Sequence, residues 1–361
     1  MDIFINGRFL TQKITGVQRF AIELLRGIDD LYENSDLSKD YKVTILAPKF
    51  EKINKSMFKH IPIETIGSRQ GHLWEQLDLF KFCKGKFLVN LCNTGPILKK
   101  DQISVIHDAA VFSNGENFSF LFKMWYKVML TSQAKLSKKI VTVSNFSKSE
   151  LVKYLNISSE KIKVIYEGKE HFTRQSTDTD IITKYNLNEK PYLLAVSSLN
   201  PNKNFRAIIK ALDHVEHHDF NIVIAGGTDP KVFSSKDTEL PKTVKHVGYV
   251  TDEELKTLYQ NAFCFIYPSF YEGFGLPPLE AMSIGCPVII SNRASLPEVG
   301  GEAALYCNPD SPEDLAEQIK KVTTDPTLRE EMIAKGYEQS AKFTWTKCAQ
   351  ELIDTVATLK I

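Results

Sequence analysis

Short apolar runs alternate with longer amphipathic stretches along most of this 361-residue sequence. The runs at residues 3–6 (IFIN), 41–48 (YKVTILAP) and 262–268 (AFCFIYP) have the length and apolar content of buried strands. The stretches between such runs carry apolar residues at helical spacing, as VQRFAIELLRGI does at residues 17–28. Strands that alternate with helices are typical of parallel, doubly wound sheets, so the pattern predicts an α/β fold.

The length of the chain and one polar stretch predict how it divides into domains. A chain of 361 residues exceeds what one hydrophobic core usually organises, so we expect two domains. The stretch HFTRQSTDTDIITKYNLNEKP is rich in polar and turn-forming residues, which favours a linker at residues 171–190. We therefore expect a first domain at residues 1–170, a second at 191–340, and a terminal helix at 341–361.

The two expected domains differ in charge although the net charge of the chain is only +1. Residues 1–170 carry 26 lysines and arginines against 18 aspartates and glutamates, whereas the remainder carries 19 against 26. A basic first half suits an anionic partner such as a membrane surface, a polyprenyl-diphosphate lipid or nucleic acid. We expect no nucleic-acid partner, because the sequence has no helix-turn-helix or zinc-finger pattern and no arrangement of aromatic residues for stacking on bases. The alternative is that the lysines form an ordinary solvated face.

The sequence does not have the features of a membrane-spanning, disulfide-rich or metal-binding protein. No apolar run is long enough to cross a bilayer and the first residues lack a secretory signal pattern, so we expect a cytoplasmic protein. The six cysteines have no CxxC spacing and several lie in apolar runs, which favours buried free thiols. The pair Asp178 and Asp180 lies in the polar stretch without other metal ligands nearby in sequence. We therefore expect no metal and no cofactor.

The strongest candidate for a functional site follows the third apolar run, in the residues SFYEGFGLPPLE. Gly273 and Gly275 precede a predicted helix, and Pro277 suits its first turn, where the missing N–H is not needed. The unpaired N–H groups and positive dipole end of such a helix favour an anion, and the glycines let a ligand approach the backbone. Glu272 and Glu280 flank this corner and suit ligand hydroxyl groups. Taken singly, a loop glutamate is usually solvated, and an acid in the first turns of a helix complements its dipole.

The segment EGFGLPPLE at residues 272–280, followed by AMSIGCPVIIS at 281–291, resembles the signature of the family 4 glycosyltransferases. It shares two glutamates with seven residues between them, a Gly-Phe-Gly loop, a proline at the helix start, and a Gly-x-Pro-Val strand. Members of that family are retaining enzymes of GT-B architecture that use nucleotide-sugar donors. The resemblance implies two Rossmann-like domains facing a cleft, with the donor on the second domain and the acceptor on the first. It also implies that the terminal helix crosses back to the first domain.

The resemblance further implies roles for individual residues. Glu272 would hold hydroxyl groups of the transferred sugar, Glu280 would hold the ribose, and Lys203 would stabilise the diphosphate leaving group. His107 would contact the donor sugar, with Asp108 orienting it, and the alternative is a structural histidine. The expected catalytic residues are thus His107, Glu272 and Lys203, and the expected donor-binding residues are Gly16, Gly273, Phe274, Gly275, Leu276, Glu280 and Arg206.

Two places leave alternatives open. Ser198 stands where the family usually has an arginine, so Lys203 must share the diphosphate with backbone amides or with a cation such as Arg206 or Arg293. The loop at residues 15–17 follows the first predicted strand, and the resemblance implies that it approaches the donor or the acceptor. On the residues alone, a helix cap with glycine at the turn explains this loop equally well.

Helix starts are predicted from capping residues. Ser147 with Glu150 and Thr251 with Glu254 have the spacing of capping boxes. Ser147 is accordingly expected to be a cap and not a nucleophile, since no serine in the chain lies in a Gly-x-Ser-x-Gly motif.

The sequence predicts a retaining, metal-independent hexosyltransferase that moves a sugar from GDP-mannose or a UDP-sugar to a glycan or lipid-linked glycan. Such a reaction belongs to the synthesis of surface polysaccharide or lipopolysaccharide. One alternative is a GT-B enzyme of other chemistry, such as an epimerase or an inverting transferase, which the spacing of the two glutamates disfavours. Another is a nucleotide-sugar-binding protein with weak catalysis, which the missing arginine makes conceivable.

Peripheral association with an anionic membrane, at its cytoplasmic face, is a further prediction from the basic first half. An aromatic-rich amphipathic stretch could insert Phe118, Phe120, Phe122 or Trp125 into the bilayer. The alternative is that these aromatics pack inside the first domain, since amphipathic helices usually face a core. The lysines concerned are Lys81, Lys84, Lys86, Lys123, Lys127, Lys135, Lys138 and Lys139.

Overall fold

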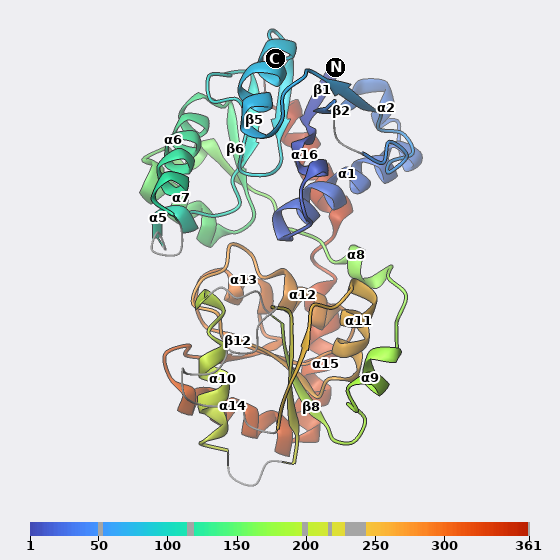
Figure 1. Cartoon of the computed structure of the whole chain (residues 1–361), viewed down its shortest axis with the longest axis vertical. Coiled ribbons are helices and arrows are strands. Elements are labelled where there is room, and N and C mark those ends of the chain that lie inside the picture. Colours follow the sequence, from blue (N-terminus) through green and yellow to red (C-terminus); the bar gives the residue numbers. More distant parts are fainter. Residues whose placement is uncertain (50–52, 114–118, 197–200, 216–218, 228–242, 360–361) are drawn as a thin grey trace. The chain divides into compact units, whose positions relative to one another are not determined.

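The computed structural model describes residues 1–49, 53–113, 119–196, 201–215, 219–227 and 243–359. The chain forms two compact units, each built around one parallel sheet (Figure 1). The first unit comprises Met1–Gly168 and Thr344–Ile361, and the second comprises Lys169–Phe343. The predicted α/β class with two Rossmann-like domains is confirmed.

The sheet of the first unit has the strand order β3-β2-β1-β4-β5-β6-β7. The strands are β1 (Asp2–Asn6), β2 (Lys42–Pro48), β3 (Ile63–Ile66), β4 (Phe87–Asn90), β5 (Gln102–Val105), β6 (Lys139–Thr142) and β7 (Ile162–Val164). The chain adds β2 and β3 on one side of β1 and the later strands on the other side. The carboxyl ends of β1 and β4 therefore mark the switch point where sheets of this kind usually bind ligands.

Helical segments connect these strands. They are η1 (Gly7–Thr11), α1 (Gly16–Asn34), α2 (Leu37–Asp40), α3 (Gly71–Leu73), η2 (Trp74–Leu79), α4 (Phe80–Phe82), α5 (Ala110–Ser113), α6 (Phe120–Leu136), α7 (Asn145–Leu155), η4 (Ser159–Lys161) and α16 (Trp345–Ala357). On one face of the sheet, Phe4, Leu46 and Leu88 from three neighbouring strands pack against Trp74 and Leu79 of η2. This packing holds η2 beside the switch point.

The last helix, α16, lies beside α1 in the first unit (Figure 1). A Cβ atom at Gly27 would come within 2.7 Å of the Trp345 carbonyl oxygen, so the two helices can approach this closely only at a glycine. The Trp345 ring also packs edge-on against Phe20, with 5.9 Å between the ring centroids. The first and last helices thus build one core.

The sheet of the second unit has the order β10-β9-β8-β11-β12-β13, so its switch point lies between β8 and β11. The strands are β8 (Tyr192–Val196), β9 (Asn221–Ala225), β10 (Val244–Gly248), β11 (Cys264–Tyr267), β12 (Val288–Ser291) and β13 (Ala304–Cys307). The helical segments are α8 (Glu170–Thr173), α9 (Asp180–Lys184), η5 (Pro201–Lys203), α10 (Phe205–Leu212), α11 (Asp252–Asn261), α12 (Leu276–Ser283), α13 (Leu296–Gly300), α14 (Pro312–Thr324) and α15 (Pro326–Ser340).

Alternating side chains of these strands face helices on the two sides of the sheet. Leu193 and Ile266 belong to a core cluster with Ile208 of α10. Phe265, which points to the other face, packs edge-on against Tyr259 of α11 at 5.1 Å between ring centroids. Figure 1 shows α10 and α11 on opposite sides of the sheet.

Residues 171–190, expected to be a linker, belong to the second unit and contain α8 and α9. Phe172 is buried and its ring lies 5.5 Å from the ring of Tyr259. Ile181 is also buried, and the Tyr185 hydroxyl donates a hydrogen bond to the Val247 carbonyl oxygen at 3.0 Å. The stretch is polar on average, but its few apolar side chains pack on this unit, and composition alone did not reveal that.

The prediction that Ser147 caps a helix was wrong, because the cap of α7 is Ser144. The Ser144 hydroxyl accepts the backbone N–H of Ser147 at 2.9 Å, while Ser147 itself is buried in the first turn. Ser144 follows β6 closely and has extended backbone, which a capping residue needs. The capping box of Thr251 and Glu254 at the start of α11 is confirmed.

Candidate functional site

The corner between β11 and α12 has the form expected from its glycines and prolines. Gly275 precedes the helix at φ 119°, a conformation that glycine adopts without strain, and prolines occupy the first turn of α12. The buried Ser295 hydroxyl lies 2.5 Å from the Phe274 carbonyl oxygen and 2.9 Å from that of Glu272. Ser295 directly precedes α13, so these hydrogen bonds attach the loop at residues 272–275 to the start of α13. Pro277 and Pro278 have no N–H, and the Leu279 N–H donates to the Gly275 carbonyl oxygen at 3.3 Å, so within the first turn of α12 the Leu276 N–H and the positive end of the helix dipole can face an anion.

Lys203 and Glu272 lie together at the switch point of the second unit. The Lys203 ammonium donates to Glu272 Oε1 at 2.7 Å and to the Tyr267 hydroxyl at 2.6 Å. The side chains of Lys203 and Glu272 are only 20% and 12% exposed, so water screens the pair weakly. An ammonium group has three protons, and these two contacts use two of them. Lys203 can thus hold Glu272 and still offer a proton to a ligand.

The loop that carries Lys203 is tied to the loop after β11. Asn204 adopts a left-handed conformation at φ 54°, which asparagine tolerates better than most residues. Its amide donates to the carbonyl oxygens of Pro268 at 3.2 Å and Pro309 at 2.7 Å. The backbone N–H of Phe270 donates to the Asn202 carbonyl oxygen at 2.8 Å. These bonds place Lys203 against Glu272 although the two residues lie far apart in sequence.

Tyr267 completes this group as a neutral phenol. Burial raises the pKa of Tyr267 well above its ordinary value, and the nearby Glu272 carboxylate raises that pKa further. The phenol therefore stays protonated throughout the physiological pH range.

Glu280 lies in the second turn of α12 and has a partner that the sequence did not indicate. Its Oε1 accepts a hydrogen bond from Nε2 of His171 at 2.8 Å, and the His171 side chain is 1% exposed. Next to this pair lies Tyr259, whose buried hydroxyl has no hydrogen-bond partner among the described residues. His171 came from the stretch expected to be a linker, and nothing in its local sequence distinguishes it from a solvated histidine.

His107 belongs to the first unit and is buried just beyond β5. Its Nε2 lies 2.9 Å from the Leu91 carbonyl oxygen, which can only accept, so Nε2 carries a proton. Its Nδ1 lies 3.8 Å from Glu167 Oε1, and its ring packs edge-on against Phe20 at 4.7 Å between centroids. Asp108, expected to orient this ring, accepts the backbone N–H of Ala110 at 2.9 Å. The ring of His107 contacts Leu91, Glu167 and Phe20.

The other expected donor residues lie in more open places. Gly16 begins α1 and is exposed, and a Cβ atom built there would meet nothing within 4 Å, so packing does not require glycine. Arg206 is exposed on α10. Arg293, a candidate for replacing the usual arginine, pairs with Asp310. Ser198 lies outside the described residues.

No group of three or more metal-ligating side chains occurs in the part of the chain that the structure describes. Asp178 and Asp180 are exposed, and the Asp178 carboxylate accepts the backbone N–H of Asp180 at 3.0 Å. The six cysteines are free, as predicted, and all except the half-buried Cys92 are buried. Burial raises the pKa of the Cys83 thiol to about 11, which disfavours the thiolate that would act as a metal ligand or nucleophile.

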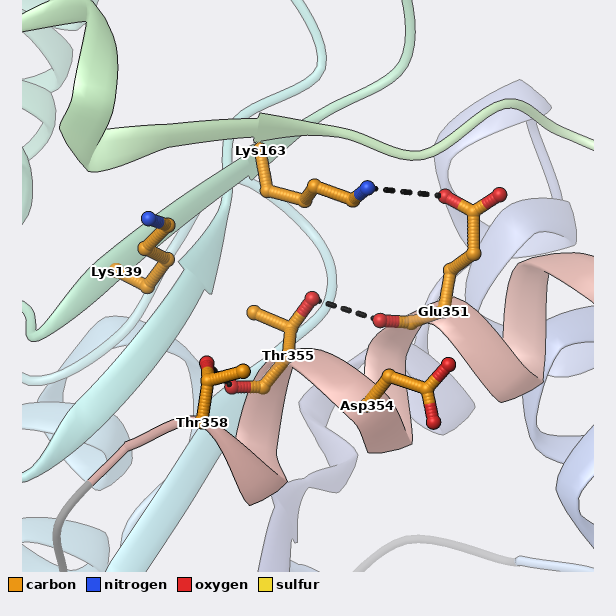
Figure 2. A pocket seen from close by; sticks show the side chains of 6 residues that line it. All are labelled: Lys139, Lys163, Glu351, Asp354, Thr355 and Thr358. Atoms are coloured by element: carbon orange, nitrogen blue, oxygen red, sulfur yellow. Dashed lines mark hydrogen bonds and ion pairs between the residues drawn. The ribbon is translucent and has the colours of Figure 1, made fainter.

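A polar pocket of about 250 Å³ lies elsewhere in the first unit, between β6, β7 and the last turns of α16 (Figure 2). It is lined by Lys139, Lys163, Glu351, Asp354, Thr355 and Thr358. Lys139 begins β6, and Lys163 pairs with Glu351 at 3.6 Å. The pocket therefore lies at the amino end of β6, whereas open parallel sheets bind ligands at the carboxyl ends of their strands.

The helix α6 presents an exposed apolar face. Phe120 is 70% exposed and Leu121 80%, and Phe122, Met124 and Val128 are also exposed. Phe120 and Phe122 are therefore exposed and do not pack inside the first domain. Trp125 is half-buried, and Phe118 lies outside the described residues. None of the helices in the described ranges is long and apolar enough to cross a membrane.

Comparison with known proteins gives one family. The family model described as glycosyl transferases group 1 matches residues 177–339. The O-antigen chain mannosyltransferase RfbU of Salmonella typhimurium is 30% identical over 339 residues, which cover 90% of this chain and 92% of that protein. The O-antigen chain mannosyltransferase B of Escherichia coli is 31% identical over 262 residues, or 70% of this chain and 69% of that protein.

A solved structure agrees in fold. The sucrose-phosphate synthase of Thermosynechococcus elongatus superimposes with a TM-score of 0.74 over 99% of this chain and 98% of that one. The sequence identity between the two is 16%, so this likeness concerns the fold alone.

Proposed function

The chain belongs to the group 1 glycosyl transferases, and we propose that it transfers mannose from GDP-mannose to a hydroxyl group of a growing surface glycan. The choice of mannose rests on its similarity to two O-antigen chain mannosyltransferases. The observation that carries the proposal is the cluster at the switch point of the second unit, where Lys203 and Glu272 meet beside the start of α12. This cluster offers cationic and dipolar partners for a diphosphate and a carboxylate for sugar hydroxyl groups.

In the proposed reaction the bond between the anomeric carbon of mannose and the diphosphate oxygen breaks. A bond from that carbon to the acceptor oxygen forms, the proton of the acceptor hydroxyl passes to the departing diphosphate oxygen, and GDP leaves. The developing charge on the diphosphate is stabilised by the positive end of the α12 dipole and by Lys203, which offers the proton that Glu272 and Tyr267 do not use. This stabilisation needs no metal ion, and we propose metal-independent transfer with retention of configuration.

Glu272 and Glu280 take different parts of the donor in this proposal. Glu272 accepts hydrogen bonds from hydroxyl groups of the transferred mannose, and Lys203 orients its carboxylate. Glu280 accepts from the ribose hydroxyl groups, while His171 holds one carboxylate oxygen in place. His107, fixed by Leu91 and Glu167, is proposed as a further contact of the transferred sugar.

The proposal extends to where the enzyme works. The exposed apolar face of α6 carries Lys123 and Lys127 at its edges, an arrangement that suits peripheral binding to an anionic bilayer. Lys138 and Lys139 contribute less, since Lys138 pairs with Asp101 at 3.3 Å and Lys139 donates to the Glu160 carbonyl oxygen. A lipid-linked glycan at the cytoplasmic leaflet would then be the acceptor.

The test is a panel of nucleotide sugars with the purified protein and mannose-containing oligosaccharides. We expect GDP-mannose to raise the melting temperature and to release GDP at a rate that rises with acceptor, and UDP-glucose to do neither. Stabilisation by GDP-mannose without GDP release would indicate a binding protein with lost catalysis. Stabilisation and turnover with UDP-glucose alone would replace the proposed donor.

A further inference from the structure

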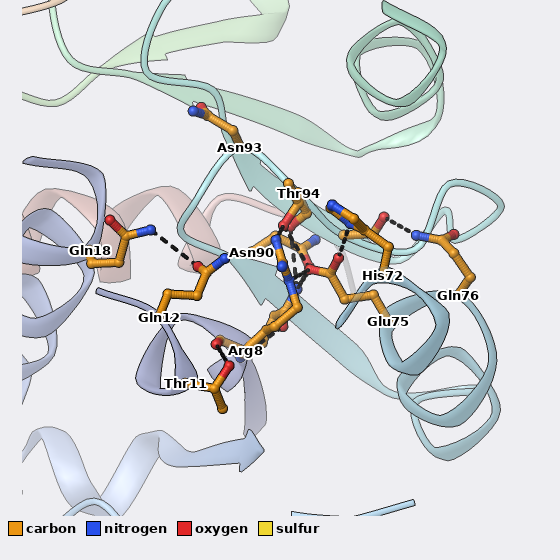
Figure 3. A network of polar contacts seen from close by, with 12 residues as sticks. Arg8, Thr11, Gln12, Gln18, His72, Glu75, Gln76, Asn90, Asn93 and Thr94 are labelled. Atoms are coloured by element: carbon orange, nitrogen blue, oxygen red, sulfur yellow. Dashed lines mark hydrogen bonds and ion pairs between the residues drawn. The ribbon is translucent and has the colours of Figure 1, made fainter. Parts of the chain in front are cut away.

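The first unit contains a buried ion pair near the carboxyl ends of β1 and β4 (Figure 3). Arg8 Nε lies 3.1 Å from Oε1 of Glu75, a residue of η2, and the same oxygen accepts from Asn6 at 2.8 Å and from Thr94 at 2.7 Å. Glu75 Oε2 lies 2.9 Å from Nδ1 of His72. Burial alone would raise the pKa of Glu75, but these hydrogen bonds and the charge of Arg8 hold that pKa below its ordinary value. Both carboxylate oxygens are thus occupied by groups of the same unit.

The ion pair of Lys203 and Glu272 in the second unit has a different third member, the phenol of Tyr267. Tyr267 is the last residue of β11 and is only 2% exposed. Its hydroxyl accepts a hydrogen bond from the Lys203 ammonium at 2.6 Å, and that ammonium lies 5.0 Å from the centre of the Tyr267 ring. Hydrogen bonds from a charged donor are stronger than those between neutral groups. Tyr267 is therefore a second anchor for Lys203, beside Glu272.

The Tyr267 side chain is itself held in place by the sheet. Tyr267 pairs with Ile290 of the neighbouring strand β12. Its ring stacks on the ring of Phe265 at 5.5 Å between centroids, and Phe265 packs edge-on against Tyr259 of α11. A side chain enclosed in this way keeps one rotamer. The phenol oxygen is thus a fixed acceptor for the ammonium group.

Two acceptors at fixed positions determine the direction of the third ammonium proton. The nitrogen of Lys203 carries three protons, and a single acceptor would let the nitrogen swing about that one bond. The bonds to Tyr267 Oη at 2.6 Å and to Glu272 Oε1 at 2.7 Å hold the nitrogen between two oxygens. The remaining N–H then has one direction. A donor whose direction is fixed before the reaction stabilises developing charge without reorganisation during the reaction.

The second anchor is neutral, which suits an anionic ligand. Burial raises the pKa of Tyr267 well above its ordinary value, and the charge of Glu272 raises it further. A carboxylate in the place of the phenol would bring a second negative charge close to a bound diphosphate. The phenol orients the ammonium group without adding such a charge.

We propose that Tyr267 is a positioning residue that directs the third proton of Lys203 toward the diphosphate of the donor. The inference rests on the proposed function, in which this diphosphate is the leaving group. Tyr267 acts through Lys203 and contacts neither the sugar nor the diphosphate. Its hydroxyl should therefore matter only while Lys203 is present.

The test is a double-mutant cycle of Tyr267→Phe and Lys203→Met. Calorimetric titration with inorganic pyrophosphate measures binding, and initial rates with GDP-mannose and α-1,3-mannobiose measure kcat. Tyr267→Phe removes only the hydroxyl group and should weaken pyrophosphate binding and lower kcat by about tenfold each, the low end for a hydrogen bond to a charged group. In the Lys203→Met background the same change should alter neither quantity by more than about twofold. Lys203→Gln, which can still donate to Glu272, is a second background for the cycle.

Tyr192→Phe is the matched control. Tyr192 is a buried tyrosine of the neighbouring strand β8, and its hydroxyl donates to the Leu258 carbonyl oxygen at 2.7 Å. Its loss should lower the melting temperature and change neither pyrophosphate binding nor kcat.

A structural role for Tyr267 would give equal effects of Tyr267→Phe with and without Lys203, and that result would overturn the inference. Unchanged pyrophosphate affinity in Tyr267→Phe would also overturn it, as would a wild type that binds no pyrophosphate. Failure of the proposed function would be distinct. The wild type would then bind pyrophosphate with the expected coupling between Tyr267 and Lys203 but would release no GDP from GDP-mannose.

Discussion

Replacing His171 tests whether a buried histidine positions the carboxylate that we assign to the ribose. In His171→Leu the side chain keeps a similar volume, but Glu280 Oε1 loses the hydrogen bond that it accepts at 2.8 Å. The Glu280 side chain is only 10% exposed, so water replaces that bond poorly. A hydrogen bond to a charged group is worth roughly 1.5–3 kcal/mol, and we expect the free energy of unfolding to fall by about 2 kcal/mol.

The same variant should weaken GDP binding about tenfold, because a carboxylate held at one oxygen presents the other to the ribose in a fixed direction. His171→Gln keeps an N–H donor and should restore most of the affinity. Isothermal titration with GDP and thermal unfolding measure the two effects separately. The matched control is His214→Leu, which removes an exposed pair with Glu313 at 3.4 Å in the same unit and should change neither quantity measurably.

A purely structural role for His171 would give a different result. Its loss would then lower the melting temperature and leave the dissociation constant of GDP within twofold of the wild type. That outcome would refute the assignment of His171 as a positioning residue and would weaken the assignment of Glu280 to the nucleotide.

Four further outcomes are expected. Glu272→Gln should lower kcat roughly tenfold to a hundredfold while GDP affinity changes little, because Glu272 is assigned to the transferred sugar. Equal losses of kcat and of GDP affinity would show that Glu272 contacts the nucleotide instead. EDTA should leave turnover unchanged, and a loss that Mg²⁺ or Mn²⁺ restores would refute metal independence. Anionic vesicles should sediment the protein, and they should sediment less of it at high salt. The double variant Lys123→Gln, Lys127→Gln should bind the vesicles roughly tenfold or more weakly, since each lysine near such a surface contributes about 1 kcal/mol. If this variant binds the vesicles as tightly as a control with two lysines of α14 replaced, α6 has no membrane role. Because the pKa of Glu75 is lower in the folded protein, its contribution to stability is present above its ordinary value of 4.5 and is lost as pH falls through the lower folded value. Thermal unfolding between pH 6 and 3 should therefore show a steeper loss for the wild type than for Glu75→Gln, and parallel curves would contradict this.

The sequence predicted best what depends on neighbouring residues. The corner at Gly275 and α12 follows from glycine and proline chemistry over a few positions, and the capping box at Thr251 follows from a three-residue spacing. The alternation of strands and helices likewise determined the α/β class. Each of these signals is local, so a single sequence contains it in full.

Contacts between distant residues could not be predicted in this way. The bond between His171 and Glu280 joins residues 109 positions apart, and the network around Glu75 joins β1, η2 and the loop after β4. Glu75 itself occurs in an amphipathic segment where a solvated face is the ordinary expectation. The stretch at residues 171–190 was interpreted as a linker because its average polarity conceals Phe172 and the side chain that supports Glu280.

The most direct test of the account is the product formed from GDP-α-mannose labelled with ¹³C at C1 in the presence of α-1,3-mannobiose. The account predicts one new α-mannosidic C1 resonance by NMR and one molecule of GDP released for each bond formed. Appearance of a β-mannoside would contradict retention of configuration. Release of free mannose at the same rate with and without mannobiose would contradict the transferase itself.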